Sequence, residues 1–162
     1  MQAADPRRPV LLLIGLPGSG KSTWARCFVQ RFPSYEVVST DATRALLYGD
    51  AATQGPWSDL WQQLEALLRQ GVQAIDLNLR AGIIFDATNA QRRRRRALVQ
   101  TLRGLGYTEV GAVWFDTPLA VCLTRNQQRD RTVPPEVILK MHRELTGAPP
   151  HISDGLDWLI RL

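Results

Sequence analysis

The sequence predicts an α/β fold in which a central parallel sheet is flanked by helices on both faces. Short apolar runs typical of buried strands alternate along the 162 residues with longer helical stretches. The first apolar run leads directly into a glycine-rich turn that opens a helix. Strand–helix alternation of this kind implies a parallel sheet covered by helices on both sides.

The first two strand–helix pairs are short and well marked. The apolar run at residues 10–14 predicts a buried strand, and the glycine-rich turn after it opens a helix over 21–31. A second apolar run at 37–39 leads into a helix over 41–47. In parallel sheets ligands bind at the carboxyl ends of the strands, so the segment that follows each strand is a candidate site.

A long helix is expected over residues 58–80, where leucines recur on one face, and Gly71 could kink or divide it. The alternation then continues to about residue 145. The remaining strands and helices are expected at residues 83–85, 91–103, 110–115, 118–128 and 135–145. The apolar segment at 156–160 is expected to dock on this domain or on a partner.

Composition and length fit a globular domain, and we expect a single domain over residues 1–162. Apolar residues make up 44% of the chain and charged residues 22%. No apolar run is long enough to span a membrane, and residues 1–9 do not read as a signal peptide. Cys27 and Cys122 fit no metal spacing and are expected to be buried free thiols. These features indicate a cytoplasmic protein without membrane partners.

The chain has a net charge of +5, and much of the excess lies in one place, the five consecutive arginines at residues 92–96. Without this run the chain would be neutral, so the charge alone does not indicate a nucleic-acid partner. The run opens the helix after the third strand, at the edge where ligands bind. Some of these arginines could therefore bind the phosphates of a nucleic acid, and a solvated helix face is the alternative.

Residues 15–22 read Gly-Leu-Pro-Gly-Ser-Gly-Lys-Ser, which is the G-x-x-x-x-G-K-[ST] pattern in its strand–turn–helix context. Glycines let backbone N–H groups curl around a phosphate at the helix N-terminus, where a plain flexible turn is the alternative. Lys21 would reach the β- and γ-phosphates, and Ser22 would offer a hydroxyl to Mg²⁺. A nucleoside triphosphate is therefore expected on Gly15, Pro17, Gly18, Ser19, Gly20, Lys21, Ser22 and Thr23.

Asp41 and Arg44 follow the second predicted strand, beside the phosphate loop. Phosphoryl transfer needs a group that orients the attacking hydroxyl and accepts its proton, and Asp41 is placed for that role. Arg44 lies one helical turn on, where it could hold a phosphate of the acceptor. The alternative is that Thr40 or Asp41 caps the helix and Arg44 is a solvated charge.

Asp86 ends the third predicted strand and is a candidate for holding Mg²⁺, directly or through water. Asp116, at the end of the fourth strand, fits the same pattern nearly as well but could cap the next helix. A third set of charges lies at Arg125, Arg129 and Arg131, before Pro134. Such arginines on a lid over about residues 125–135 could neutralise the transferred phosphoryl group, and an exposed helix end is the alternative.

In order and spacing these motifs resemble the P-loop polynucleotide 5′-hydroxyl kinase family over residues 11–145. The matching segments are residues 15–24, Ser39-x-Asp41-x-x-Arg44, Asp86-x-Thr88-Asn89, Arg125-Asn126-x-x-Arg129, and Val133-Pro134 with Val137-Ile138. The resemblance implies a P-loop kinase fold with a helical, arginine-bearing lid. It also implies that Asp41 is the general base, that Arg44 holds the acceptor phosphate and that Arg125 and Arg129 contact ATP. Asp86 would hold metal or orient Arg44.

The expected activity is ATP- and Mg²⁺-dependent transfer of a phosphoryl group to the 5′-hydroxyl end of DNA or RNA. Catalysis is expected from Lys21, Asp41, Arg44 and Arg129. The alternatives are a small-molecule kinase acting on a nucleoside, sugar or antibiotic, and an ATP-binding module without transfer activity. Trp57 and Trp61 could form a stacking platform for a terminal base, although core packing is the favoured interpretation.

Overall fold

Five parallel strands form one sheet in a computed structural model that describes residues 6–53 and 55–162. Their order across the sheet is β2-β3-β1-β4-β5. The strands are β1 (Pro9–Gly15), β2 (Tyr35–Ser39), β3 (Gly82–Asp86), β4 (Glu109–Phe115) and β5 (Trp158–Arg161). The helices are α1 (Lys21–Arg31), α2 (Thr40–Tyr48), α3 (Trp57–Asp76), α4 (Arg92–Leu105), α5 (Leu119–Gln127) and α6 (Pro135–Gly147), with a short 3₁₀ turn η1 (Ile152–Asp154).

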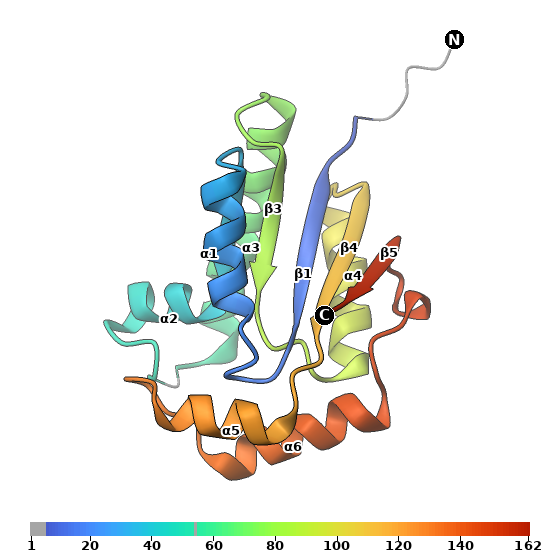
Figure 1. The fold of residues 1–162 in the computed structure, drawn as a ribbon. Coiled ribbons are helices and arrows are strands. Elements are labelled where there is room, and N and C mark those ends of the chain that lie inside the picture. Colours follow the sequence, from blue (N-terminus) through green and yellow to red (C-terminus); the bar gives the residue numbers. More distant parts are fainter. Residues whose placement is uncertain (1–5, 54) are drawn as a thin grey trace.

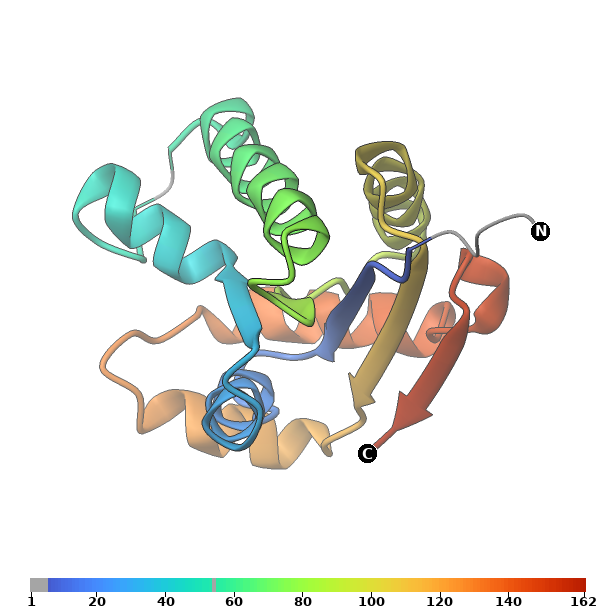
Figure 2. The same cartoon turned by 90° about the horizontal axis from the view of Figure 1, so that it is seen from above.

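Helices cover both faces of the sheet, as the sequence predicts (Figure 2). Strand β1 shows why, because its side chains alternate between two apolar clusters. Val10, Leu12 and Ile14 pack toward α3 and α4, whereas Leu11 and Leu13 pack toward α1. All five are buried, which is the pattern of a central strand in a parallel sheet. The predicted α/β fold is therefore confirmed.

Helices α5 and α6 lie across the carboxyl ends of the strands rather than along a face of the sheet (Figure 1). Helix α5 follows β4, and α6 returns beneath the sheet toward η1 and β5. This arrangement forms a layer opposite the segments that follow β1, β2 and β3. The edge at which ligands bind in parallel sheets is consequently enclosed on one side by these two helices.

The structure corrects the expectations for α3 and Cys27 and specifies how the C-terminal segment docks. Helix α3 runs unbroken through Gly71 and ends at Asp76, before the expected end at residue 80. A Cβ at Gly71 would lie 2.7 Å from Cγ1 of Ile83, so this glycine serves close helix–sheet packing instead of a kink. The apolar segment near the C-terminus is strand β5, paired parallel to β4. Cys122 is buried as expected, but Cys27 is exposed.

No helix in the two described ranges is long and apolar enough to cross a membrane.

Candidate active site

The phosphate loop connects β1 to α1, and its glycines are required by its shape. Gly18 has φ +81° and Gly20 has φ +100°, values that side chains rarely tolerate. A Cβ at Gly18 would also lie only 2.6 Å from the carbonyl oxygen of Cys122, so α5 packs directly on the loop. No side chain caps the N-terminus of α1, and no acidic residue lies in its first turn. Its first N–H groups can therefore bind an anion.

The Lys21 side chain is folded back over this loop and is buried. Its Nζ donates to the carbonyl oxygens of Gly15 and Leu16, both at 2.8 Å, and to Oγ of Ser19 at 3.3 Å. Burial lowers the pKa of Lys21 to about 8, although the charge of Asp86 opposes that shift. A phosphate bound in the loop would add negative charge next to this ammonium and would stabilise its protonated form.

Ser22 and Asp86 bring together two oxygen ligands from different elements. Ser22 lies in the first turn of α1 and donates a 2.6 Å hydrogen bond from Oγ to Oδ2 of Asp86, the last residue of β3. A hydroxyl and a carboxylate are the ligand types that Mg²⁺ takes alongside water and nucleotide phosphates. Asp116, the competing candidate, instead pairs with Arg161 of β5. The geometry thus favours Asp86 over Asp116 for a metal next to the phosphate loop.

Asp41 lies between two arginines at the start of α2. Its Oδ1 accepts a hydrogen bond from Nη1 of Arg44 at 3.1 Å and forms an ion pair with Nη1 of Arg131 at 2.7 Å. The N-cap of α2 is Ser39, whose hydroxyl accepts from the N–H of Ala42, so Asp41 is not needed as a cap. Asp86 was also a candidate for orienting Arg44. In the structure Arg44 pairs with Asp41, and Asp86 accepts a hydrogen bond from Ser22.

The predicted lid spans the end of α5, the loop after it and the start of α6. Arg125 lies over the phosphate loop, with Nη1 3.4 Å from the carbonyl oxygen of Gly18. The buried side chain of Asn126 donates to the carbonyl oxygen of Val133 and accepts from its N–H, at 2.8 and 2.9 Å. These two bonds fix the base of the loop that carries Arg129 and Arg131. Arg129 lines the cavity described next.

All of these groups open onto one cavity of about 1390 Å³ at the carboxyl ends of the strands. One part is polar and is lined by the phosphate loop, Asp86, Asp41 and the arginines of the lid. The other part is largely apolar and extends between α3, α4 and α6. Its lining includes Trp57, Trp61, Leu98, Val137 and Met141. The volume exceeds that of an ordinary small-molecule pocket, about 300–1,000 Å³, and leaves room for two ligands side by side.

The two tryptophans of this wall have different surroundings. Trp61 packs against the main apolar core, but Trp57 is 58% exposed. Their rings are stacked, with centroids 6.3 Å apart and an interplanar angle of 20°. The favoured expectation of core packing therefore fits Trp61 and is wrong for Trp57.

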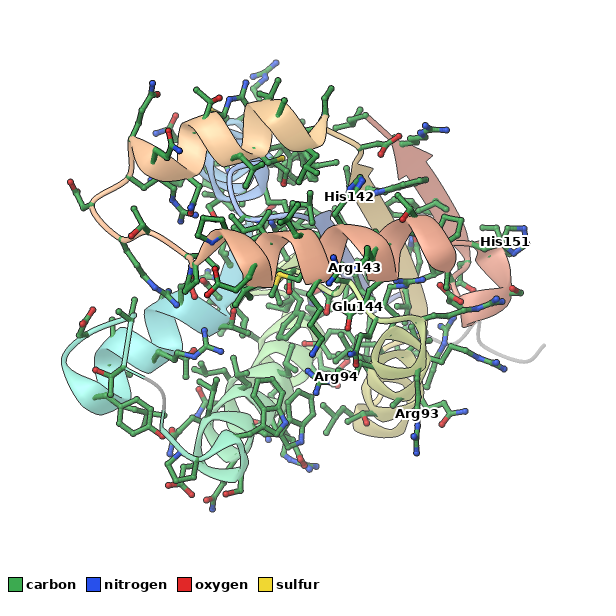
Figure 3. The ribbon with its side chains drawn as sticks, turned by 90° about the horizontal axis from the view of Figure 1, so that it is seen from below. Arg93, Arg94, His142, Arg143, Glu144 and His151 are labelled. Atoms are coloured by element: carbon green, nitrogen blue, oxygen red, sulfur yellow. The ribbon has the colours of Figure 1, made fainter. Side chains whose placement is uncertain are left out.

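The run of five arginines divides between structural and exposed positions. Arg95 is 1% exposed and binds Asp154 and three backbone carbonyls, while Arg92 binds the other oxygen of Asp154. These two arginines fasten α4 to η1, so Arg95 is not among the arginines of the run that could bind a nucleic acid. Arg94 lines the cavity. Glu144 of α6 lines the same cavity, and Figure 3 shows Arg93 pointing away from α6.

Sequence reasoning missed the contact between Arg131 and Asp41. Arg125 and Arg129 are four residues apart, which relates them on a helix, but α5 ends at Gln127 and Arg131 lies in the loop beyond. Helical spacing therefore gave no reason to place Arg131 beside the second strand. The clustering of three arginines before a proline was the available signal.

Similar proteins include kinases of quite different acceptors. An L-seryl-tRNA(Sec) kinase of Methanococcus maripaludis is 24% identical over 137 residues, covering 83% of this chain and 51% of that protein. A chain in a structure of the Pnkp1/Rnl/Hen1 RNA repair complex aligns over 90% of this chain and 46% of its own, with a TM-score of 0.76 and 25% identity. A gluconokinase from Sinorhizobium meliloti aligns with a TM-score of 0.58 and 16% identity, over 99% of this chain and 83% of its own.

The chain thus spans about half the length of the tRNA kinase and of the RNA repair protein. The gluconokinase, at its low identity, shows only a shared fold. The likeness to the RNA repair chain confirms the resemblance read from the motifs, at the level of a kinase with a P-loop. The AAA_33 family model, described as an AAA domain, matches residues 10–148. The chain belongs to this family and has the fold of a P-loop kinase.

Proposed function

We propose that this protein transfers the γ-phosphate of ATP to the 5′-hydroxyl end of a DNA or RNA strand, with Mg²⁺. The observation that carries the proposal is the position of Asp41. This carboxylate, with Arg44 and Arg131 bonded to it, opens onto the same cavity as the phosphate loop. A module that only bound ATP would have no use for a base and a phosphate-binding arginine on the acceptor side of the cavity.

Each side chain then has a distinct task. The phosphate loop and Lys21 would bind the β- and γ-phosphates, and Arg125 and Arg129 would bind the nucleotide from the lid. Ser22 and Asp86 would hold Mg²⁺, which neutralises charge on the phosphates when bound. Asp41 would accept a hydrogen bond from the 5′-hydroxyl and take its proton as the new P–O bond forms, while ADP leaves.

Arg44 would hold the phosphate that follows the first nucleotide of the acceptor. It reaches Asp41 at 3.1 Å, so a hydroxyl at Asp41 and an anion at Arg44 would lie on neighbouring groups. A guanidinium suits this role because it binds phosphate oxygens through two parallel N–H groups. This pairing favours an acceptor that carries a phosphate close to its hydroxyl, as a nucleic-acid strand does.

The relatives support a nucleic-acid acceptor without specifying it. Two of the three proteins described above are named for RNA, a tRNA kinase and a member of an RNA repair complex. The cavity of about 1390 Å³ is also larger than an ordinary small-molecule pocket. A small-molecule kinase remains the competing candidate, because a gluconokinase shares the fold.

The test is to offer γ-labelled ATP and Mg²⁺ with 5′-hydroxyl DNA, 5′-hydroxyl RNA, a nucleoside panel and gluconate. We expect label on an oligonucleotide, and label found only on a small alcohol would refute the proposal. Asp41→Asn should lower kcat by about 100-fold or more while ATP binding is kept. Lys21→Ala should abolish transfer, and unchanged turnover in Asp41→Asn would remove Asp41 from the chemistry.

A further inference from the structure

Trp57 is an exposed aromatic side chain that lines the cavity. Among the large apolar side chains that are exposed in the described ranges, it alone lines the cavity. The others, which include Leu46, Leu77 and Ile160, lie elsewhere on the surface. An exposed indole in a cavity is typical of a ligand contact, because a structural tryptophan gains most from full burial.

Trp61 supports Trp57 from behind. The two residues are one helical turn apart on α3, and their rings stack at 6.3 Å between centroids. Trp61 in turn packs on the main apolar core. The exposed ring is therefore backed by a second ring that the fold holds in place, so little freedom remains to be lost when a ligand stacks on it.

The rest of this part of the cavity combines apolar surface with a few polar groups. Leu98, Val137 and Met141 also line it. Gln91 donates a 2.6 Å hydrogen bond from Nε2 to Oε1 of Glu144, and both side chains face the cavity together with Arg94. A nucleobase has flat apolar faces and hydrogen-bonding groups along its edge, so it suits an apolar wall with a few polar side chains at its margin. A sugar carries hydroxyl groups all round and would need polar groups on every side.

The position of this wall relative to the reacting groups is fixed by the packing of α2 on α3. Helix α2 carries Asp41 and Arg44, and α3 begins with Trp57. All three side chains line the same cavity. A nucleotide whose 5′-hydroxyl lies at Asp41 and whose following phosphate lies at Arg44 would extend its base toward this wall.

We propose that Trp57, backed by Trp61, stacks on the base of the 5′-terminal nucleotide of the acceptor and so selects a nucleotide end over other alcohols. The inference rests on the proposed function and specifies the acceptor of the same site. Stacking is tolerant of sequence, because every base has a flat π-face. The platform therefore predicts dependence on the presence of a terminal base and little preference among the four bases.

The experiment is a double-mutant cycle between the protein and the acceptor. Wild type and Trp57→Ala are compared on two 5′-hydroxyl oligonucleotides, one complete and one in which the 5′-terminal nucleotide lacks its base. On the complete strand Trp57→Ala should raise KM about tenfold, with kcat changed much less. On the strand without the terminal base the substitution should have almost no effect. Equal loss on both strands, or no loss on either, would overturn the proposal.

Two control variants separate stacking from a general disturbance. Trp57→Phe keeps a flat ring and should recover most of the affinity for the complete strand. Leu77→Ala removes a similarly exposed apolar side chain, 69% exposed at the other end of α3 and outside the cavity, and should match wild type on both strands. ATP affinity should be the same in every variant, since Trp57 is placed on the acceptor side.

A failure of the proposed function would be recognised separately. If wild-type protein labels no oligonucleotide, binding of adenosine and of a short 5′-hydroxyl strand is measured by tryptophan fluorescence. If the ligand quenches the tryptophan fluorescence of wild type but not that of Trp57→Phe or Trp57→Ala, the base platform is supported while strand phosphorylation is rejected. Absence of any such Trp57-dependent quenching would reject the platform as well.

Discussion

Replacing Arg95 with methionine should destabilise the protein far more than the same change at its neighbour Arg93. Arg95 is 1% exposed, and its partner carboxylate on Asp154 is fully buried. The guanidinium donates to Oδ2 of Asp154 at 3.0 Å and to the carbonyl oxygens of Asn89, Ala90 and Ala148 at 3.2, 2.7 and 2.8 Å. Methionine fills a similar volume but satisfies none of these acceptors.

The loss of stability is estimated from the buried acceptors that lose their donor when Arg95 is replaced. Breaking a buried ion pair by removing one partner costs about 3–5 kcal/mol. Each buried carbonyl that loses its donor costs about 1–3 kcal/mol, although these losses overlap with the first. Arg92 still neutralises Asp154 through its other oxygen, which keeps the total near the lower end. We expect a loss of about 4 kcal/mol from a domain stability of about 5–15 kcal/mol.

The assay is equilibrium urea unfolding, followed by circular dichroism, with thermal melts alongside. A loss of this size corresponds to a fall in Tm of about 10 °C for a chain of this length. Arg93→Met is the matched control, since Arg93 is exposed on the same turn of α4 and should change stability by less than about 0.5 kcal/mol. If Arg95→Met unfolds within about 1 kcal/mol of wild type, the assignment of Arg95 to a structural role is wrong.

Three further predictions concern the site. Burial lowers the pKa of Lys21 to about 8, so kcat/KM for ATP should fall about tenfold per pH unit above that value. Because the unfolded chain keeps this proton up to about its usual pKa of 10.5, urea stability should rise between those two pH values, and Lys21→Met should abolish the rise. Asp86→Asn should raise the Mg²⁺ concentration for half-maximal rate by about 10- to 100-fold, and an unchanged Mg²⁺ titration would contradict its role. Arg131→Ala removes a half-exposed ion pair to Asp41, so Tm should stay unchanged. Trypsin should cleave the loop after Arg129 faster in this variant than in wild type. Equal cleavage rates would show that the ion pair does not fasten the lid.

Most of the fold was predictable because the first four strands and the helices after them have local signals in the sequence. Strand β1 is apolar throughout, and the phosphate loop after it has a fixed residue pattern. Strand β5 was not recognised as a strand, since its pairing with β4 depends on a partner far along the chain. Gly71 shows the same limit, because a glycine within a helix can break it or let it approach a sheet, and only the position of Ile83 decides between these.

The candidate site was predictable where motif and strand end coincide. Residues at the ends of β1, β2 and β3 meet because parallel strands bring their carboxyl ends to one edge. Asp41, Asp86 and Lys21 all line the cavity there, and their chemical roles stay predictions until the variants are measured. The contact of Arg131 with Asp41 could not be predicted in this way, because Arg131 lies in a loop, follows no strand and is not placed by helical periodicity.

The arginine run shows why residue type and charge alone could not predict the role of each arginine in this chain. Five identical side chains follow one another, and a helical wheel separates them by direction but does not say what lies in each direction. Asp154, nearly 60 residues later, converts Arg95 into a buried structural group, whereas Arg94 reaches the cavity between α4 and α6. Salt dependence of acceptor binding should therefore fall in Arg94→Ala and stay as in wild type in Arg93→Ala. An equal change in both would mean that the run acts through its overall charge, and the partition into separate roles would not stand.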